Sequence, residues 1–275
     1  MCENSNARTY STARPRDKFP MKLATWNINS LKVRLPHVLD WLARQQPDVL
    51  CLQETKLENA KFPLEALREA GYRALISGQK TYNGVAILSR AQALDPLSSI
   101  PGWDDEQKRV LAATVAGVRI VCLYVPNGEN IDTPKYQYKM KWIDAAREWL
   151  REELTKHSKL AVAGDFNIAP EPADVHDPAL WETKIHFTPQ EREALKTLFA
   201  LGLKDSFRLF EQPERSYTWW DYRMMAFRRK MGLRIDHILL SPALAQLCTS
   251  CTIDIEPRRD ERPSDHAPVM AELRL

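Results

Sequence analysis

Apolar and polar positions alternate along this chain in short segments whose spacing predicts a mixture of strands and helices. Apolar runs of strand length lie at residues 22–29, 48–54, 72–77, 84–89, 110–115, 118–125, 160–163, 217–220, 234–240, 252–256 and 269–273. Helical periodicity marks residues 31–46, 63–70 and 188–201, together with a long segment that continues through Leu150. A further short helix begins at Ser241-Pro242.

Turn and cap residues support these boundaries. Ala116-Gly117 separates two predicted strands and indicates a hairpin turn. The long helix has Asp132 or Thr133 as its N-cap, and Thr188-Pro189-Gln190-Glu191 is a capping box for the next helix. Because hairpins are mixed with helices, the order argues against a regular βαβ array. We expect an α/β (α+β) fold, a four-layer sandwich of two packed mixed β-sheets flanked by helices.

Nothing in the chain marks an internal domain boundary. It has 275 residues, 44% of them hydrophobic, and it lacks internal repeats, low-complexity tracts and Gly/Ser linkers. We therefore expect residues 21–275 to form a single domain. Residues 1–20 are polar and lack the apolar segment of a signal peptide, so they are predicted to be a disordered leader.

Cysteine usage and hydrophobicity indicate the compartment. The five cysteines are Cys2, Cys51, Cys122, Cys248 and Cys251. Cys51 and Cys122 lie in apolar runs as small buried hydrophobes, while Cys248 and Cys251 have no second pair nearby, which argues against a zinc or redox site. No apolar stretch of about 18 residues is present to span a bilayer. These features predict a reduced, cytoplasmic protein that does not enter membranes.

The formal net charge of +3 is compatible with an anionic partner but does not identify one. Five basic residues gather in one stretch beside aromatic residues: Arg223, Arg228, Arg229, Lys230 and Arg234. This stretch is either a solvated basic loop or a loop that contacts phosphates. Charge alone leaves both interpretations open.

Polar side chains follow the apolar runs where the strands are expected to end. In chain order they are Asn27 and Asn29, Glu54, Tyr124 and Asn127, and Asp165 and Asn167. Taken singly, each is an ordinary turn residue, because Asn and Asp favour turns. As a set they predict a cleft at one rim of the sheets, because turns do not require a Glu directly after a buried strand.

These residue types suit hydrolysis of a phosphodiester, which needs a metal on oxygen ligands, an activated water and donors around the phosphate. Mg²⁺ prefers a few carboxylates and retains waters. Glu54 is therefore the natural ligand, with Asp265 and Asn27 as helpers. The expected cofactor is Mg²⁺, for which Mn²⁺ can substitute.

Three further residues suit the proton transfers. Asp165 would orient or deprotonate the attacking water, and His266 would bind the phosphate as a cation or share the role of base, its ring held by Asp236. A Ser-His-Asp hydrolase would use the same pair, but no Gly-x-Ser-x-Gly elbow is present. A zinc hydrolase would need several His or Cys ligands that the chain does not offer.

Eight segments in a fixed order carry a family resemblance: 25–29 (TWNIN), 52–56 (LQETK), 124–128 (YVPNG), 164–167 (GDFN), 187–192 (FTPQER), 217–222 (YTWWDY), 232–236 (GLRID) and 264–268 (SDHAP). Each is weak alone, whereas the ordered set is very specific. It resembles the exonuclease III family of apurinic/apyrimidinic endonucleases, within the deoxyribonuclease-I-like endonuclease/exonuclease/phosphatase superfamily. The resemblance runs from about Met21 to the C-terminus.

The resemblance implies a role for each matching residue. Around the metal it places Glu54 as the principal ligand, Asn27 and Asp265 beside it, and Asp165, Asn167 and His266 close by. Asp165 would activate water or protonate the leaving oxygen. Asn167 and His266 would bind the scissile phosphate, with the Tyr124 hydroxyl beside it, and Asp236 would pair with His266.

The resemblance also implies which residues meet DNA. They are Asn127, Lys56 and Arg223, together with Trp219, Leu233 and Ile235 as a small apolar pocket for a base-free deoxyribose. Trp219 and Trp220 are adjacent, so one of the two would face away from the core in a strand. Lys56 follows the metal ligand and would tune its charge.

His186 departs from the family pattern, which usually has a small residue at this position near the DNA. One interpretation is a solvent-exposed loop histidine. The other is steric: the ring would hinder a continuous duplex but not a duplex that ends at a nick or a 3′ terminus. His186 would then favour 3′-end work over internal cleavage at abasic sites.

The expected activity is that of a magnesium-dependent DNA-repair phosphodiesterase, acting as 3′–5′ exonuclease, 3′-phosphatase, 3′-phosphodiesterase and abasic-site endonuclease. Its partner would be double-stranded DNA with abasic sites, nicks or blocked 3′ ends, bound by a monomer. Inositol-polyphosphate phosphatases and sphingomyelinases share the metal machinery, but the Trp219-Trp220 segment and the basic run favour DNA. A DNA-binding module without catalysis would lack Glu54, Asp165, Asp236 or His266, and all are present.

Overall fold

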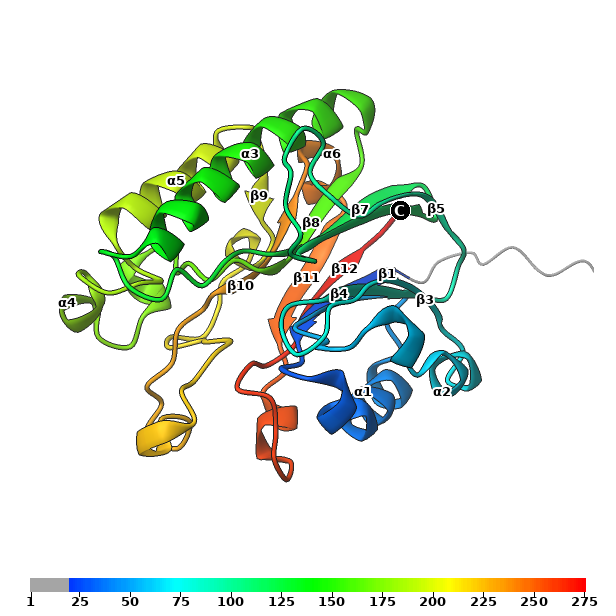
Figure 1. The fold of residues 1–275 in the computed structure, drawn as a ribbon, viewed down its shortest axis with the longest axis horizontal. Helices are drawn as coiled ribbons and strands as arrows, with labels where there is room; N and C mark the ends of the chain where they lie inside the picture. Colours follow the sequence, from blue (N-terminus) through cyan, green and yellow to red (C-terminus); the bar gives the residue numbers. More distant parts are fainter. Residues whose placement is uncertain (1–19) are drawn as a thin grey trace, which may run out of the picture.

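Two six-stranded sheets pack face to face in the computed structural model, which describes residues 20–275 (Figure 1). Almost all of the expected N-terminal leader lies outside the described residues. The first sheet has the order β11-β12-β1-β2-β4-β3. Its strands are β1 (Met21–Asn27), β2 (Val49–Gln53), β3 (Arg73–Ser77), β4 (Val85–Ser89), β11 (Cys248–Ile253) and β12 (Val269–Leu273).

The second sheet has the order β5-β6-β7-β8-β10-β9. Its strands are β5 (Ala93–Leu97), β6 (Val110–Val115), β7 (Val118–Tyr124), β8 (Leu160–Asp165), β9 (Lys204–Asp205) and β10 (Asp236–Leu240). Both sheets are mixed, because β1 runs parallel to β2 and β7 runs parallel to β8, while the other neighbours are antiparallel.

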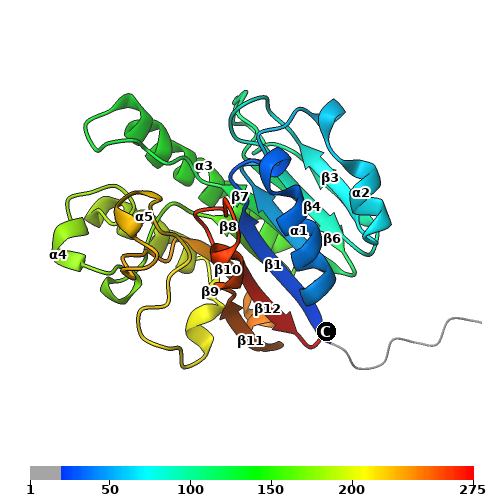
Figure 2. The same ribbon diagram turned by 90° about the horizontal axis from the view of Figure 1, so that it is seen from below.

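Helices cover the outer face of each sheet. The helices of the described residues are α1 (Leu31–Gln45), α2 (Leu64–Glu69), α3 (Pro134–Lys156), α4 (Pro178–Trp181), α5 (Pro189–Phe199) and α6 (Pro242–Ala245), with 3₁₀ turns η1 (Asn59–Lys61), η2 (Pro172–Asp174), η3 (Phe207–Leu209), η4 (Arg223–Met225) and η5 (Glu256–Arg259). Figure 2 shows α1 and α2 on one side of the paired sheets and α3 and α5 on the other. The expected four-layer sandwich is confirmed.

Three hydrophobic layers hold the sandwich together. The central layer lies between the sheets and includes Leu23, Ile120 and Ile238. A second layer joins the second sheet to α3 and α5, and a third joins the first sheet to α1 and α2. Burial of these apolar faces is the main favourable contribution to folding. Cys51 and Cys122 lie in the central layer as buried free thiols, as expected, whereas Cys2 lies outside the described residues.

Helix starts follow the expected local chemistry. The Thr133 hydroxyl, rather than Asp132, accepts from Tyr136 N at 3.3 Å and caps α3. The capping box of α5 is confirmed, because Thr188 Oγ1 accepts from Glu191 N and Glu191 Oε2 accepts from Thr188 N. Within residues 20–275, no helix is long and apolar enough to cross a membrane.

The expected elements differ from the structure at three places. Residues 217–220 form no regular strand, because only Trp219 makes isolated bridges, to Leu233 and His266. The strand expected at 252–256 is β11, which runs from Cys248 to Ile253; because it is an edge strand with Cys251 as its one buried residue, the apolar pattern did not mark its start. The edge strand β5 was missed because its centre is exposed and contains Pro96.

Candidate active site

Polar side chains from both sheets meet at one rim of the sandwich. The strands β1, β2, β7 and β8 end at this rim, and β10 and β12, which run antiparallel to their neighbours, begin there. Asp236 opens β10 directly opposite Asp165, the last residue of β8. The polar residues at these strand ends are therefore brought together, although Asn27 and Asp165 are 138 positions apart and Asn29 and Asp265 are 236 positions apart in the chain.

The turn at Gly164-Asp165-Phe166-Asn167 is shaped by a close approach of β7. A Cβ at position 164 would lie 2.0 Å from the Leu123 carbonyl oxygen, so only glycine fits there. Asn167 has a positive φ of 51° and donates its backbone N–H to Asp165 Oδ1 at 2.9 Å. Its side-chain amide donates to Val125 O at 3.0 Å. The turn thus holds the Asp165 carboxylate and the Asn167 amide in fixed directions.

Asn27 joins the two sheets at the centre of the site. Its amide nitrogen lies 2.9 Å from Glu54 Oε1 and 2.8 Å from Asp165 Oδ2. The Tyr124 hydroxyl donates to Glu54 Oε1 at 2.9 Å, and Lys56 Nζ lies 2.8 Å from Glu54 Oε2. Burial opposes the charge on Glu54, but Lys56 and Asn27 outweigh it and hold the pKa of this carboxyl below its usual value.

A histidine lies between two carboxylates on the other side of Asn27. His266 Nδ1 is 2.8 Å from Asp236 Oδ2, and His266 Nε2 is 3.9 Å from Asp165 Oδ2. Burial opposes a charged ring, but Asp236 and Asp165 outweigh it and raise the pKa of His266 to about 10. Burial, supported by Asp236 and opposed by His266, raises the pKa of Asp165 to about 7. The arrangement combines a cationic ring with a carboxylate able to exchange a proton near neutral pH.

Asp265 is held by donors from two loops. Its carboxylate accepts from Asn29 Nδ2 at 2.9 Å and from Trp219 Nε1 at 3.0 Å. Asn29 Oδ1 in turn accepts from Lys56 Nζ at 2.6 Å. Burial disfavours the charged carboxylate, but His266, Asn29 and Trp219 outweigh it and lower its pKa. Asn29 therefore connects Asp265 to the Glu54–Lys56 pair, a contact that its position after β1 did not predict.

Two groups of side chains at this rim are able to hold a metal ion. Asp165, Asp236 and His266 offer buried ligand atoms that lie within 4.8 Å of one another. A protonated His266 has no lone pair for a metal, however, and its Nδ1–H is committed to Asp236. Glu54 and Asp265, connected through Lys56 and Asn29, offer carboxylate oxygens, the ligands that a hard divalent cation prefers.

The residues expected to form an apolar pocket lie together beside the Asp265 loop. Leu233 and Ile235 are buried in a small cluster with Phe187, and Trp181 and Trp219 pack against it. Because Leu233 and Ile235 are at most 1% exposed, an incoming sugar would contact Trp219 rather than the aliphatic side chains beneath it. Trp181 was not anticipated from the sequence.

His186 packs against this cluster, and Phe187, Leu233, Ile235, Trp181, Trp219 and His186 together are called the apolar wall. The interpretation of His186 as a solvent-exposed loop residue is wrong. The side chain is buried, with its ring centre 5.9 Å from that of Trp219. Burial lowers the pKa of His186 to about 4, with Lys139 adding to the effect. The neutral ring donates from Nδ1 to Asn167 O at 2.8 Å, which leaves Nε2 to accept from Asn127 Nδ2 at 3.5 Å.

A fully buried ion pair supports the two loops that carry Asn127 and Asn167. Lys139 Nζ donates to Asn167 O at 2.8 Å, to Asn127 O at 3.2 Å and to the Glu191 carboxylate. Glu191 also closes the capping box of α5. Lys139 was missed, although a lysine three residues after Tyr136 on the apolar face of α3 was a detectable signal.

We expect Lys139→Met to lower the free energy of unfolding by about 3–5 kcal/mol, because it leaves the buried Glu191 carboxylate without its cation. Denaturant unfolding measures this value. Lys141→Met is the matched control, since Lys141 is exposed on the same helix and its loss should change stability by less than about 0.5 kcal/mol. Equal stability of the two variants would contradict the importance of the pair.

The basic run divides into two parts. Arg223, Arg228, Arg229 and Lys230 are exposed, and Arg223 forms a salt bridge with Asp221. Including Arg234 in a possible phosphate-binding loop was wrong. Its guanidinium is 1% exposed and forms salt bridges with Asp174 and Asp205, so it stabilises the interior and cannot reach DNA.

Comparisons with known proteins agree with this geometry. A sequence model of the endonuclease/exonuclease/phosphatase family matches residues 24–266. The exodeoxyribonuclease III of Haemophilus influenzae is 35% identical over 268 residues, covering 92% of this chain and 100% of the relative. A solved structure of the 3′ phosphatase NExo from Neisseria, bound to a product DNA hairpin, has a TM-score of 0.91 and 52% identity, with 92% of this chain and 99% of that chain covered.

An apurinic/apyrimidinic endonuclease from Archaeoglobus fulgidus is similar over the same region. Its structure has a TM-score of 0.90 and 40% identity, and the match covers 93% of this chain and 100% of that one. The family model and these relatives span the residues that form the rim. The chain therefore belongs to the exonuclease III family of the endonuclease/exonuclease/phosphatase superfamily and is a hydrolytic nuclease.

Proposed function

We propose that this protein is a magnesium-dependent DNA-repair phosphodiesterase that acts mainly at 3′ ends of duplex DNA. Its activities would be those of a 3′–5′ exonuclease, 3′-phosphatase and 3′-phosphodiesterase, with internal abasic-site cleavage as a weaker activity. The observation that carries the proposal is the buried His266, placed between Asp236 and Asp165, with Asn27 joining Asp165 to Glu54. The 3′-phosphatase activity named for the Neisseria relative supports the substrate class.

In this mechanism the charged His266 ring binds a non-bridging phosphate oxygen. The Asn167 amide and the Tyr124 hydroxyl, which donate to Asp165 and Glu54 in the free protein, would turn to donate to the same phosphate. Asp165 accepts a proton from the attacking water, which its pKa of about 7 permits near neutral pH. The P–O3′ bond breaks, and the proton goes to the leaving 3′ oxygen. A Mg²⁺ ion held by Glu54, with Asp265 and Asn27 beside it, would supply stabilisation of the phosphate charge.

The preference for 3′ ends rests on His186 and its place in the apolar wall. The imidazole fills the space between Asn127 and Trp219, where the strand beyond an internal abasic sugar would have to continue. A terminal phosphate or sugar would end before this wall. His186 has a φ of 79°, a conformation that favours glycine, so exchange for glycine would remove the ring without straining the backbone.

Matched duplexes with a nick, a recessed end, a 3′-phosphate or an internal abasic site test the proposal. We expect the wild type to act on the first three with Mg²⁺, to lose activity with chelator, and to cleave the internal site more slowly. Release of phosphate from an inositol phosphate but not from DNA would sink the proposal.

His186→Gly is expected to raise the rate of internal abasic cleavage at least about tenfold relative to 3′-phosphatase activity, because it opens the path of a continuous strand. His157→Gly, at a histidine that caps the far end of α3, is the control. A glycine variant that gains no internal cleavage would refute the steric role of His186.

A further inference from the structure

Exonuclease action requires room for the base of the terminal nucleotide, whereas 3′-phosphatase action does not. An ordinary 3′-terminal nucleotide carries a base, and that base must lie somewhere when the phosphate on its 5′ side reaches Asp165 and His266. The apolar wall offers little room, because Leu233 and Ile235 are covered and the His186 ring is buried against Trp219. The base therefore needs a separate space close to the phosphate site.

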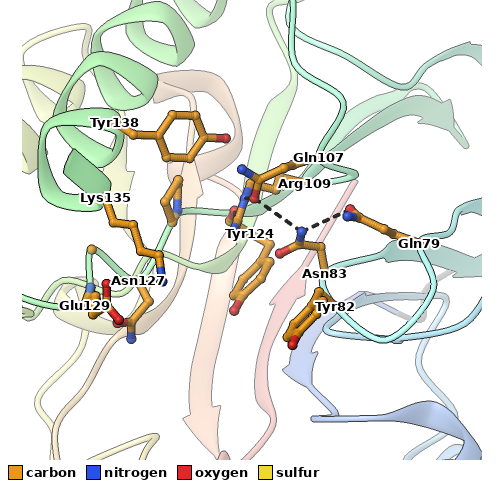
Figure 3. Close-up of a pocket in the computed structure, with 12 residues that line it drawn as sticks. Gln79, Tyr82, Asn83, Gln107, Arg109, Tyr124, Asn127, Glu129, Lys135 and Tyr138 are labelled. Carbon is orange, nitrogen blue, oxygen red and sulfur yellow. Dashed lines mark hydrogen bonds and ion pairs between the residues drawn. The ribbon is translucent and has the colours of Figure 1, made fainter. Parts of the chain in front are cut away.

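A cavity of about 630 Å³ opens beside Tyr124 and Asn127 (Figure 3). This volume falls within the range of about 300–1,000 Å³ typical of small-molecule sites. Asn127 lines the cavity and also contacts His186, with 3.5 Å between Asn127 Nδ2 and His186 Nε2. Asn127 therefore connects the cavity to His186.

Three carboxamides form one wall of the cavity. Asn83 Nδ2 donates to Gln79 Oε1 at 3.0 Å and to Gln107 Oε1 at 3.3 Å. Gln79 Oε1 also accepts from Lys108 N, and Gln107 Oε1 also accepts from Arg109 Nε. Among the residues that the structure describes, Gln79 Nε2, Gln107 Nε2 and Asn83 Oδ1 have no partner. Two donors and one acceptor thus remain for a ligand, a combination able to bind the polar edge of a nucleobase.

Aromatic and basic groups complete the cavity. Figure 3 shows Tyr138 and Lys135, both from α3, opposite the carboxamides, with Tyr82 near Asn83. Aromatic side chains stack on bases without preference for their identity. The Lys135 side chain is 68% exposed, and its Nζ lies 3.1 Å from the Glu129 carboxylate.

The cavity is also connected to the catalytic rim. The Arg109 guanidinium lies over the Tyr124 ring, 4.6 Å from its centre, and Nη1 donates to Tyr124 O at 3.3 Å. Arg109 therefore links Gln107 in the cavity wall to the residue whose hydroxyl contacts Glu54.

We propose that this cavity, the amide pocket of Gln79, Asn83 and Gln107, receives the unstacked base of the 3′-terminal nucleotide while the exonuclease reaction removes it. Water attacks the phosphorus, the P–O3′ bond breaks, and the nucleotide leaves as a 5′-monophosphate from the pocket. The inference rests on the proposed 3′-end function and adds where the base is held. The 3′-phosphatase reaction, which releases only phosphate, leaves the pocket empty.

The double variant Gln79→Ala/Gln107→Ala tests the proposal. Values of kcat/KM are measured on a recessed duplex that ends in an ordinary nucleotide and on the same duplex that ends in a 3′-phosphate. We expect the ratio of exonuclease to 3′-phosphatase kcat/KM to fall about tenfold or more, because the base loses two hydrogen bonds. Gln137→Ala, at an exposed glutamine of α3, is the matched control and should leave the ratio unchanged.

A third substrate separates base recognition from a general structural effect. The duplex ends in a tetrahydrofuran nucleotide, which has no base, and its removal relative to 3′-phosphatase activity should be the same in the double variant and the wild type. An unchanged exonuclease ratio, or an equal loss on the base-free end, would overturn the pocket. A wild type without activity on any of these DNA ends would instead overturn the proposed function itself.

Discussion

Asp165→Asn is expected to lower kcat on a 3′-phosphate duplex by about 10²–10⁴-fold, the usual contribution of a general base. The amide keeps the size of the carboxylate, and its oxygen is able to accept from Asn167 N as Asp165 Oδ1 does at 2.9 Å. It is unable to take a proton from water, and it leaves His266 with one carboxylate partner rather than two. Single-turnover kinetics with Mg²⁺ measures the effect on the chemical step.

Binding of DNA should change little in this variant, because affinity depends mainly on phosphate contacts spread over the surface. Fluorescence anisotropy with a labelled nicked duplex checks this, and His266→Asn should behave in the same way. Asp144→Asn, at an exposed position on α3, controls for the loss of one negative charge. Near-normal turnover in Asp165→Asn would show that another group is the base and would defeat the mechanism.

Glu54→Gln is expected to raise the Mg²⁺ concentration needed for half-maximal activity by at least about tenfold and to lower activity at saturating Mg²⁺. An amide is a much weaker ligand for a hard cation than a carboxylate, and Asp265 would remain as the main anionic ligand nearby. The exchange also leaves Lys56, 2.8 Å from Glu54 Oε2, without its charged partner. A Mg²⁺ titration of activity, paired with calorimetric titration of the free protein, measures both effects.

Glu58→Gln is the control for this substitution, because Glu58 lies four positions further along the chain and its partly exposed carboxylate interacts with the lysines Lys61 and Lys80. Its Mg²⁺ dependence should match the wild type. If Glu54→Gln needs no more Mg²⁺ than this control, the metal is bound elsewhere, and the buried group of Asp165, Asp236 and His266 becomes the site to examine.

Most of the sandwich was predictable because its strands and helices are long enough for the spacing of their apolar residues to be recognised in the sequence. The hairpin at Ala116-Gly117 and the capping box at Thr188 and Glu191 have local chemical causes, and both formed as expected. The failures lie where packing is one-sided or irregular. The edge strands β5 and β11 bury few side chains, and Trp219 pairs through single bridges to loops distant in the sequence.

In the active site, too, local features were predictable and contacts between distant segments were not. Polar residues after buried strands were visible in the sequence, and parallel and antiparallel pairing brings strand ends of the right direction to one rim. The local pattern did not predict which residues contact one another. Asn29 contacts Asp265, Lys139 contacts two loop carbonyls, and Trp181 contacts His186 in the apolar wall. Asn29 and Asp265 are 236 positions apart, and Lys139 and Asn167 are 28 apart. Trp181 and His186 are close in the chain but lie where a short helix ends in irregular turns, so no period in the chain encodes any of these contacts.

The sequence by itself determined the layers of this protein and the residue types at its rim, because periodic burial and strand-end polarity are local properties. Only the tertiary structure decided what state those residues are in. His186 was interpreted either as a solvent-exposed residue or as a ring that hinders a continuous duplex. Packing against Trp219 makes the ring buried and neutral. Arg234 belonged to a basic run, and burial against Asp174 and Asp205 removes it from any DNA surface. Burial and charge partners depend on contacts between distant segments, and these exist only once the two sheets have packed.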